Sequence, residues 1–297
     1  MTLNILKTYK ILILVTIQKR RNMGIKKSVL GLIIVLLIVI FLYDNKRITI
    51  SRVELENTKV KKDIVITQIS DLHNTQFGKN QKNIIKKVKE ASPDIVVITG
   101  DVIDQNHTDI DVALQLVSEI VKIAPTYYVT GNHEAASEEF EVLNGGMQNA
   151  GVKVLSNESL YLEEYNIYLY GVEDPTFMIE DYFFQTEENV MIETLDTFDF
   201  DLDCYNILLS HRPEFFEEYC QYNINLILSG HAHGGQIRIP GVGGVVAPGQ
   251  GIFPKYTEGV YKDANTSMIV SRGLGNSIIP LRINNNPELV QIVISGE

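Results

Sequence analysis

The sequence predicts an α/β protein built on a parallel sheet, and three observations support this prediction. Apolar runs rich in β-branched residues recur at residues 63–70, 95–99 and 126–130. The segments between these runs, 80–90 and 109–123, carry their apolar residues at helical spacing. Each strand with its helix occupies about 30 residues, which is typical of βαβ units in a parallel sheet.

The remainder of the chain adds further strands to this pattern. Short apolar runs predict strands at 48–57, 206–210, 226–229, 268–272 and 289–295. Residues 161–174 predict a hairpin that turns near residues 164–166. No internal repeat or linker divides residues 46–297, so we expect a single domain there.

The N-terminal part of the chain differs in composition from the rest. Residues 29–43 form an uncharged apolar run, and the residues before it carry seven basic and no acidic side chains. This pattern predicts a basic extension at 1–22, one signal-anchor transmembrane helix at 23–45 and a domain at 46–297. No cleavage pattern follows the run, which disfavours a removed signal peptide. Because basic flanks stay in the cytoplasm, we expect a single-pass protein of the cell membrane with an extracytoplasmic domain.

The charge of the domain excludes some partners. Without the seven N-terminal basic residues, the chain has 19 basic and 37 acidic residues, which gives a net charge of about −18. Such a surface repels phosphate backbones, so no nucleic-acid partner is expected, and no protein partner is evident. Residues 173–203 hold eleven acidic residues and no basic one. This segment is predicted to be a solvated insertion, or alternatively a lid over the site.

Cys204 and Cys220 are the only cysteines of the chain. An exported location would permit one disulfide between them, but two cysteines make neither a disulfide framework nor a zinc cluster. We expect two buried free thiols.

Polar side chains follow five of the apolar runs, at the point where each predicted strand ends. The residues concerned are Asp71, His73, Asp101, Asp104, Asn132, His133, Glu134, His211, His231 and His233. Five of the six histidines of the chain are among them. Loops at the carboxyl ends of parallel strands converge, and open α/β sheets build their sites there. Any one of these side chains has an ordinary structural explanation, but the set together predicts a functional site.

The donor types in this set predict a metal centre. Imidazoles, carboxylates and one carboxamide suit Mn²⁺, Fe²⁺ or Zn²⁺ better than Ca²⁺, which prefers oxygen ligands only. The candidate ligands are Asp71, His73, Asp101, Asn132, His211, His231 and His233. Seven ligands exceed the need of one such ion, so two divalent ions are predicted, and a carboxylate is suited to bridge them.

The order of the motifs resembles a known family. D-x-H at 71–73, G-D-x-x-D at 100–104, G-N-H-E at 131–134, a lone His211 and G-H-x-H at 230–233 look like the calcineurin-like metallophosphoesterase superfamily. The resemblance covers about residues 65–295 and implies a four-layer αββα sandwich behind the N-terminal helix. The anchor and the run GHAHGGQIRIPGVGG resemble the membrane-associated bacterial branch, which includes enzymes related to UDP-2,3-diacylglucosamine pyrophosphatases.

The resemblance implies a role for each site residue. The first metal ion would be bound by Asp71, His73 and His233, the bridge would be Asp101, and the second ion would be bound by Asn132, His211 and His231. His133 resembles the catalytic histidine beside the leaving group, with Asp104 as its orienting partner. The reaction implied is direct attack by a metal-bound hydroxide on phosphorus, with His133 protonating the departing oxygen.

Several nearby residues lie outside the set of candidate ligands. Glu134 is expected either to orient groups behind the metal ligands or to be a surface acid, and Arg212 either to contact phosphate or to be structural. Residues 241–254 are predicted to form a loop near the site, with Lys255 and Tyr256 able to meet a substrate headgroup. The protein phosphatases of the family carry Arg where this chain has Gln105, which disfavours a phosphoprotein substrate.

The function predicted is hydrolysis of a phosphodiester, pyrophosphate or phosphomonoester, on a lipid-linked or cell-envelope substrate. The alternative is a non-catalytic metal-binding or sensor domain that has kept the fold. His133 and Asp104 disfavour it, because they serve catalysis and not metal binding. A different metallohydrolase is a further alternative, but the H-x-H-x-D-H motif of β-lactamase-like enzymes is absent from the chain.

Overall fold

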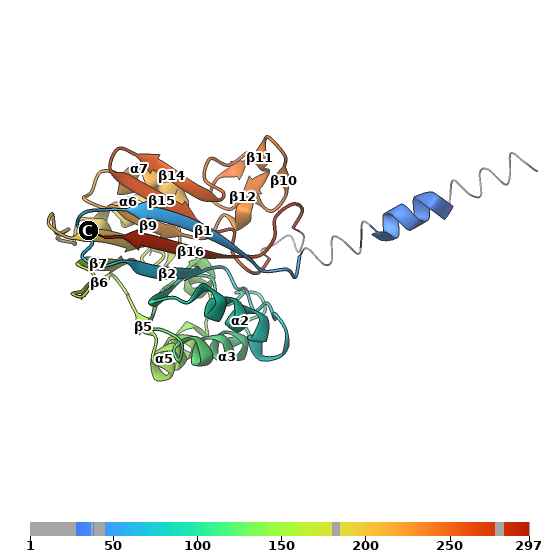
Figure 1. Ribbon diagram of the computed structural model, residues 1–297, viewed down its shortest axis with the longest axis horizontal. Helices are drawn as coiled ribbons and strands as arrows, with labels where there is room; N and C mark the ends of the chain where they lie inside the picture. The colour runs from blue at the N-terminus through green and yellow to red at the C-terminus, as the bar shows by residue number, and fades with distance from the viewer. Residues whose placement is uncertain (1–27, 37, 39–44, 180–184, 277–281, 297) are drawn as a thin grey trace, which may run out of the picture. The chain divides into compact units, whose positions relative to one another are not determined.

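The computed structural model describes residues 28–36, 38, 45–179, 185–276 and 282–296 (Figure 1). The chain divides into two units, Met1–Asp44 and Asn45–Glu297. In the first unit, residues 28–36 are helical and their side chains are exposed. No helix within the described ranges has the length and apolarity needed to cross a membrane, so the predicted spanning helix is not supported. The predicted extension 1–22 and most of the predicted anchor 23–45 lie outside the described residues.

The second unit is built on two six-stranded sheets. The first sheet has the order β1-β16-β2-β3-β4-β5. Its strands are β1 (Thr49–Glu56), β2 (Ile64–Ile69), β3 (Ile95–Thr99), β4 (Thr126–Val129), β5 (Lys153–Val154) and β16 (Glu288–Ser295). β2 to β5 are parallel to one another, while β16 runs antiparallel to β2 and parallel to β1. The C-terminal strand therefore separates the first two strands of the chain.

The second sheet has the order β14-β15-β9-β8-β7-β6. Its strands are β6 (Glu158–Leu162), β7 (Ile167–Gly171), β8 (Tyr205–Leu209), β9 (Leu226–Ser229), β14 (Gly259–Asp263) and β15 (Thr266–Val270). β7, β8, β9 and β15 are parallel, and the edge strands β6 and β14 pair with their neighbours as antiparallel hairpins. The predicted hairpin around residues 164–166 is the β6–β7 pair.

Helices cover the outer face of each sheet, which gives four layers (Figure 1). On the first sheet lie α2 (Lys82–Ala91), α3 (Ile110–Ile120) and α5 (Phe140–Ala150); on the second lie α6 (Glu187–Leu195) and α7 (Phe216–Tyr219). Shorter elements are α4 (Asn132–Ala135), η1 (Lys79–Gln81), η2 (Pro175–Phe177), η3 (Pro213–Phe215) and η4 (His233–Gly235). The prediction of a mixed α/β fold is confirmed.

The central strands are mainly apolar because both of their faces are buried. In β3, Val96 and Ile98 pack with the helices, whereas Ile95 and Val97 pack between the two sheets. Successive side chains of a strand point to opposite faces, so a continuous apolar run is what such a strand requires. This packing holds the carboxyl ends of the strands rigidly.

Two parts of the fold differ from the sequence prediction. Residues 241–254, predicted as a loop, contribute to two short hairpins: β10 (Arg238–Ile239) with β11 (Gly243–Gly244), and β12 (Val246–Ala247) with β13 (Gly251–Ile252). Helix α5 was not predicted, because Gly145 and Gly146 lower its helix propensity. Gly146 instead permits close packing, since a Cβ there would lie 2.7 Å from a methyl carbon of Leu114 in α3.

Candidate metal centre

The two sheets bring the ends of five strands to one edge. β2, β3 and β4 of the first sheet are followed by Asp71, Asp101 and Asn132, and β8 and β9 of the second sheet are followed by His211 and His231. Nε2 of His211 lies 3.1 Å from Oδ2 of Asp101, so the two sheets meet at this edge through their site residues. The predicted convergence is therefore present.

One group of ligands gathers around Asp71. Asp71, His73, Asp101 and His233 can each offer an atom within 4.8 Å of the others, and all four are buried. Nε2 of His233 lies 3.2 Å from Nε2 of His73 and 3.5 Å from Oδ1 of Asp71. Oδ2 of Asp101 lies 3.5 Å from Nε2 of His73.

A second group shares Asp101 with the first. Asp101, His211 and His231 are buried and also lie within 4.8 Å of one another. Nδ1 of His231 lies 3.1 Å from Nε2 of His211, while Nδ1 of His211 lies 2.7 Å from the carbonyl oxygen of Thr99. Together the two groups form the histidine–aspartate cluster, which consists of Asp71, His73, Asp101, His211, His231 and His233. Asp101 is the one member that belongs to both groups.

The cluster fits divalent ions. Imidazole nitrogens about 3.2 Å apart have the spacing of two ligands around one ion, given metal–ligand bonds of about 2.0–2.2 Å. Two buried oxygens nearby, Oδ2 of Asp71 and Oδ1 of Asn132, have no hydrogen-bond partner. A buried polar atom without a partner costs free energy, and a bound cation would satisfy it.

The ionisation of three of the four histidines in the cluster suits metal binding. His211 differs, because burial lowers its pKa but Asp101 raises it by more, to about 10. Burial lowers the pKa of His73 to about 4 and lowers the pKa values of His231 and His233 well below the ordinary value. These imidazoles are therefore neutral near pH 7, which is the form that binds metal ions. Burial raises the pKa of Asp101, but His211 and its neighbours lower it by more, to well below the ordinary value. Asp101 is therefore ionised.

The backbone is strained at the cluster. Asp71, His73, Asp101, His231 and His233 all have positive φ, between 42° and 64°. Side chains other than glycine rarely adopt this region, and residues held in it concentrate at functional sites. The tight turns aim five side chains inward from the strand ends, a feature that the sequence did not reveal.

His133 lies beside the cluster and is held by a backbone group. Its ring centroid is 4.4 Å from that of His73, in an edge-to-face arrangement. Nδ1 of His133 accepts a hydrogen bond from the backbone N–H of Gln105, at 3.1 Å. A neutral imidazole has one acceptor and one donor nitrogen, so Nε2 carries the proton. Asp104 lies within the same 4.8 Å group as His73 and His133, and its orienting role remains a prediction.

Glu134 is a buried positioning residue and not a surface acid. Its carboxylate accepts hydrogen bonds from the backbone N–H groups of Gly131, Asp101, Val102 and Ile103, at 2.7 to 3.2 Å. These groups belong to the loops after β3 and β4. Glu134 therefore joins the loop of Asp101 to the loop of Asn132 and His133.

Glu214 stands behind the cluster and was missed by the sequence analysis. Its Oε1 lies 3.6 Å from Nε2 of His231, whose other nitrogen faces His211. At this distance the two atoms are not hydrogen-bonded, and Nε2 of His231 has no hydrogen-bond partner. A carboxylate beside a metal-binding histidine nevertheless favours the tautomer with the proton on the nitrogen that faces it. A Cβ added to Gly249 would lie 2.5 Å from Oε1 of Glu214, so the chain passes closely over this carboxylate. The only hint of Glu214 in the sequence was the position of an acidic residue three residues after His211.

Arg212 has a structural role. It is buried, and it forms ion pairs with Asp174 at 2.5 Å, Glu187 at 3.2 Å and Glu214 at 3.3 Å. Its charge is thus matched by carboxylates and is not free for a phosphate. Asp174 and Glu187 belong to the acidic segment 173–203. Part of this segment therefore contacts Arg212, the residue that follows His211.

The remaining predicted residues lie apart from the cluster. Lys255 is exposed and paired with Glu217 at 2.7 Å, while Tyr256 is buried against Phe216, and their contact with a substrate headgroup stays a prediction. The two cysteines are free thiols, as expected, although Cys220 is only half-buried.

Comparison with known proteins agrees with the site. Residues 64–235 match the calcineurin-like phosphoesterase family, and the chain belongs to it. The chain is therefore a hydrolase that acts on phosphoesters.

Several known proteins are similar to the chain. The chain is 31% identical to the uncharacterized metallophosphoesterase YkuE of Bacillus subtilis, over 78% of this chain and 79% of that protein. It is 29% identical to an uncharacterized metallophosphoesterase of Aquifex aeolicus, over 84% and 92%, and 27% identical to a bovine transmembrane protein with a metallophosphoesterase domain, over 78% and 53%. A dimetal phosphatase structure from Danio rerio is similar at a TM-score of 0.46 and 11% identity, covering 71% of this chain and 88% of that one.

Proposed function

We propose that the protein hydrolyses a phosphodiester, pyrophosphate or phosphomonoester with two divalent ions held by the histidine–aspartate cluster and Asn132. The observation that carries this proposal is the position of Asp101, which is shared by two groups of ligands beside His133. Two ions at such a site would polarise the phosphoryl oxygens and lower the pKa of a water molecule.

The residues of this chain have separate tasks in the proposed reaction. Asp71, His73 and His233 would bind one ion, Asn132, His211 and His231 the other, and Asp101 both. Nε2 of His133 carries a proton, so His133 can protonate the departing oxygen. Glu134 keeps the loops after β3 and β4 in position, and Glu214 places a carboxylate near Nε2 of His231. Burial of these groups excludes bulk water, which strengthens each electrostatic interaction.

The first test is metal-dependent turnover. Metal is removed from the purified chain, Mn²⁺, Zn²⁺ or Fe²⁺ is returned, and hydrolysis of bis-p-nitrophenyl phosphate and p-nitrophenyl phosphate is followed. We expect turnover to return with metal, and the ratio of the two rates to separate diesterase from monoesterase activity. Metal bound without turnover of either compound would instead support the non-catalytic sensor.

We further propose that the protein is attached to the cell membrane by the apolar run 29–43, with its catalytic domain outside the cytoplasm. The basic residues before the run and the resemblance to the membrane-associated branch support this proposal. A substrate with a lipid-linked or cell-envelope phosphoester fits such a location. A periplasmic-type reporter fused after residue 297 should be active, and a silent reporter would contradict the orientation.

A further inference from the structure

An uncharged stretch lies on the surface of the second unit. Residues 239–254 contain no Asp, Glu, Lys or Arg, although 21% of the chain is charged and about three such residues would be expected in a stretch of this length. The stretch spans most of the β10–β11 and β12–β13 hairpins. Exposed hairpins are where charged side chains normally gather, so their absence here needs a reason.

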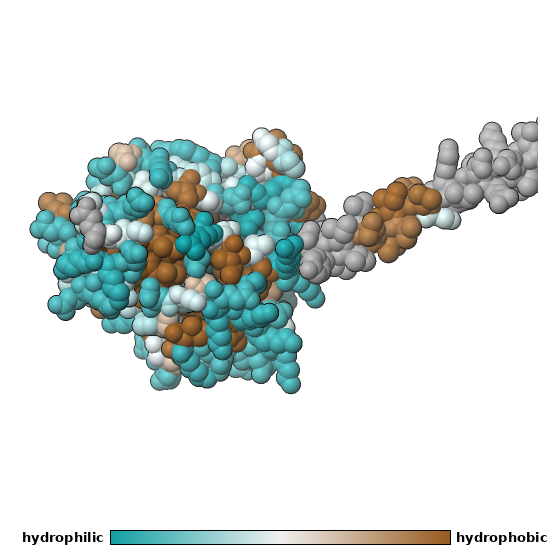
Figure 2. Space-filling view, in the orientation of Figure 1, coloured by the Kyte–Doolittle hydropathy of each residue, from teal (hydrophilic) through white to brown (hydrophobic). Residues whose placement is uncertain are grey.

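Large apolar side chains are exposed on these hairpins. We call them, together with one residue of the neighbouring segment, the apolar corner: Ile239 (44% exposed), Val242 (62%), Ile252 (74%), Phe253 (63%) and Ile283 (39%). Figure 2 shows brown and white surface at the place of β10 and β11 in Figure 1. An exposed cluster of this kind marks an interaction surface, whereas single exposed apolar residues are ordinary.

The hairpins are held together by backbone hydrogen bonds. The N–H of Arg238 donates to the carbonyl of Ile283 at 2.9 Å, and the N–H of Phe253 donates to the carbonyl of Val245 at 2.8 Å. Val245 in turn donates to the carbonyl of Ile237, also at 2.9 Å. The two hairpins and the segment at Ile283 are thus connected through their backbones.

The second unit begins beside this corner. The apolar run ends at residue 43, and Asn45 is the first residue of the second unit. The side chain of Asn45 exchanges two hydrogen bonds with the backbone of Arg282, at 2.9 and 3.0 Å. Arg282 immediately precedes Ile283, so the first residue of the second unit lies near the apolar corner.

The corner also adjoins the histidine–aspartate cluster. A Cβ added to Gly235 would lie 2.4 Å from the Cα of Gly244 in β11, so the hairpin packs directly on the turn that follows His233. Nη2 of Arg282 lies 3.4 Å from Nδ1 of His233. A surface that covers the corner therefore lies close to the proposed metal ions.

We propose that the apolar corner inserts into the lipid bilayer and holds the metal centre at the membrane surface. This proposal rests on the membrane attachment proposed above. The acidic remainder of the domain is repelled by anionic lipids, whereas an uncharged corner can enter the bilayer without that cost. The substrate class that fits is an amphiphile whose phosphoester stays in the headgroup region while its chains remain in the membrane.

The chain contains no tryptophan, so single tryptophans can report on insertion. Three full-length variants are reconstituted in phosphatidylcholine vesicles with or without brominated acyl chains: Phe253→Trp in the corner, Leu36→Trp in the apolar run, and Leu202→Trp as control. Leu202 is 72% exposed and lies before the start of β8, at the end of that strand away from His211. We expect brominated lipid to quench Phe253→Trp and Leu36→Trp at least twofold more strongly than Leu202→Trp.

Each outcome decides the proposal. Quenching of Leu36→Trp without Phe253→Trp leaves the attachment intact and overturns the inserted corner. Quenching of neither overturns both, while metal-dependent turnover of bis-p-nitrophenyl phosphate by the same samples reports separately on the proposed reaction. A blue shift of Phe253→Trp that depends on protein concentration and occurs without vesicles would assign the corner to a second copy of the chain and overturn the lipid contact.

Discussion

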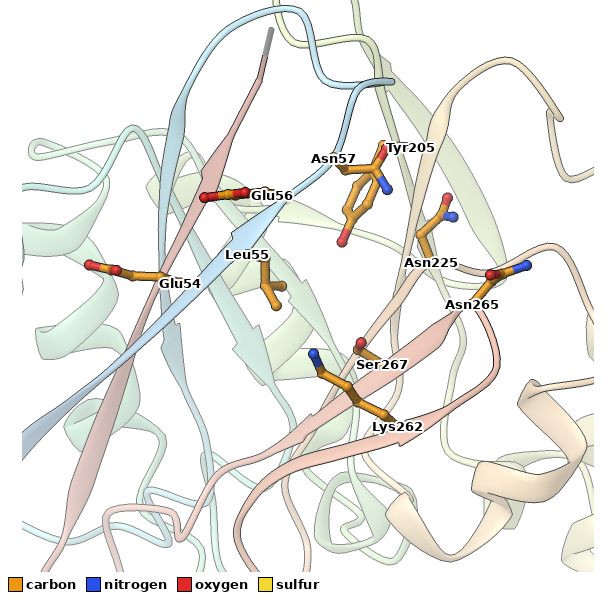
Figure 3. A pocket seen from close by; sticks show the side chains of 9 residues that line it. All are labelled: Glu54, Leu55, Glu56, Asn57, Tyr205, Asn225, Lys262, Asn265 and Ser267. Carbon is orange, nitrogen blue, oxygen red and sulfur yellow. The ribbon is translucent and has the colours of Figure 1, made fainter.

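Two polar regions of the domain differ from each other. One is the edge that carries the histidine–aspartate cluster, at the carboxyl ends of the strands, and the other is a hollow at the opposite ends of the strands of the second sheet. The hollow, with a volume of about 510 Å³, lies between β1 and the β14–β15 hairpin (Figure 3). Nine residues line it: Glu54, Leu55, Glu56, Asn57, Tyr205, Asn225, Lys262, Asn265 and Ser267. It is roomy and polar, as a binding site would be.

The two regions differ in burial and backbone strain. Eight of the nine residues of the hollow are exposed or half-buried, none has positive φ, and none has a buried polar atom without a partner. All six residues of the histidine–aspartate cluster are buried, and five have positive φ. The difference teaches that unsatisfied buried groups on a strained backbone indicate a site better than available space does.

The largest effect is expected from Asp101→Asn. This change removes the charge shared by the two ligand groups but keeps an oxygen for the backbone N–H of His133, which now donates to Oδ1 at 2.9 Å. We expect loss of bound metal, measured by elemental analysis, and turnover at background. Full metal content in this variant would contradict the bridging role.

His133→Ala should separate catalysis from metal binding. Loss of a general acid lowers kcat by about 10²–10⁴-fold. We expect metal content to remain unchanged, and the loss to be larger for an alkyl leaving group than for p-nitrophenolate, which departs without a proton. His107→Ala, which alters an exposed histidine outside the cluster, is the matched control. Equal losses for both leaving groups would argue against proton donation by His133.

Glu214→Ala should weaken metal binding without direct contact with the metal. Removal of a carboxylate behind a metal ligand typically costs about 10–100-fold in metal affinity. Glu214→Gln keeps an acceptor for Nε2 of His231 and should recover part of this loss. The measurement is the metal concentration that gives half-maximal turnover. Glu217→Gln, an exposed acid in α7, is the control, and an equal shift there would remove the special role of Glu214.

The smallest effect is expected in the hollow. Lys262→Gln and Ser267→Ala change exposed or half-buried side chains away from the cluster. Such substitutions usually alter the free energy of unfolding by no more than about 0.5 kcal/mol. Turnover and metal content should match the unchanged protein. A clear loss of turnover in either variant would show that the hollow, and not only the histidine–aspartate cluster, contributes to function.

The strands and the site residues could be predicted wherever a pattern of neighbouring residues in the sequence indicates them. The run at 95–99 coincides with β3, because a strand buried on both faces carries apolar side chains at successive positions and not only at alternate ones. The polar residues after the strands were visible for the same reason, since they interrupt these runs. Helix α5 was not visible, because its glycines serve packing against α3 and not local propensity.

The sequence alone determined the α/β class, the five strand ends and the types of ligand, because periodicity and chemistry are carried by neighbouring residues. Only the tertiary structure decided that β16 separates β1 from β2, that Glu134 joins the loops after β3 and β4, and that Glu214 lies beside His231. These facts join residues far apart along the chain, or depend on strained turns and on side-chain directions. Their physical cause is the packing of two sheets at one edge, which no local pattern encodes.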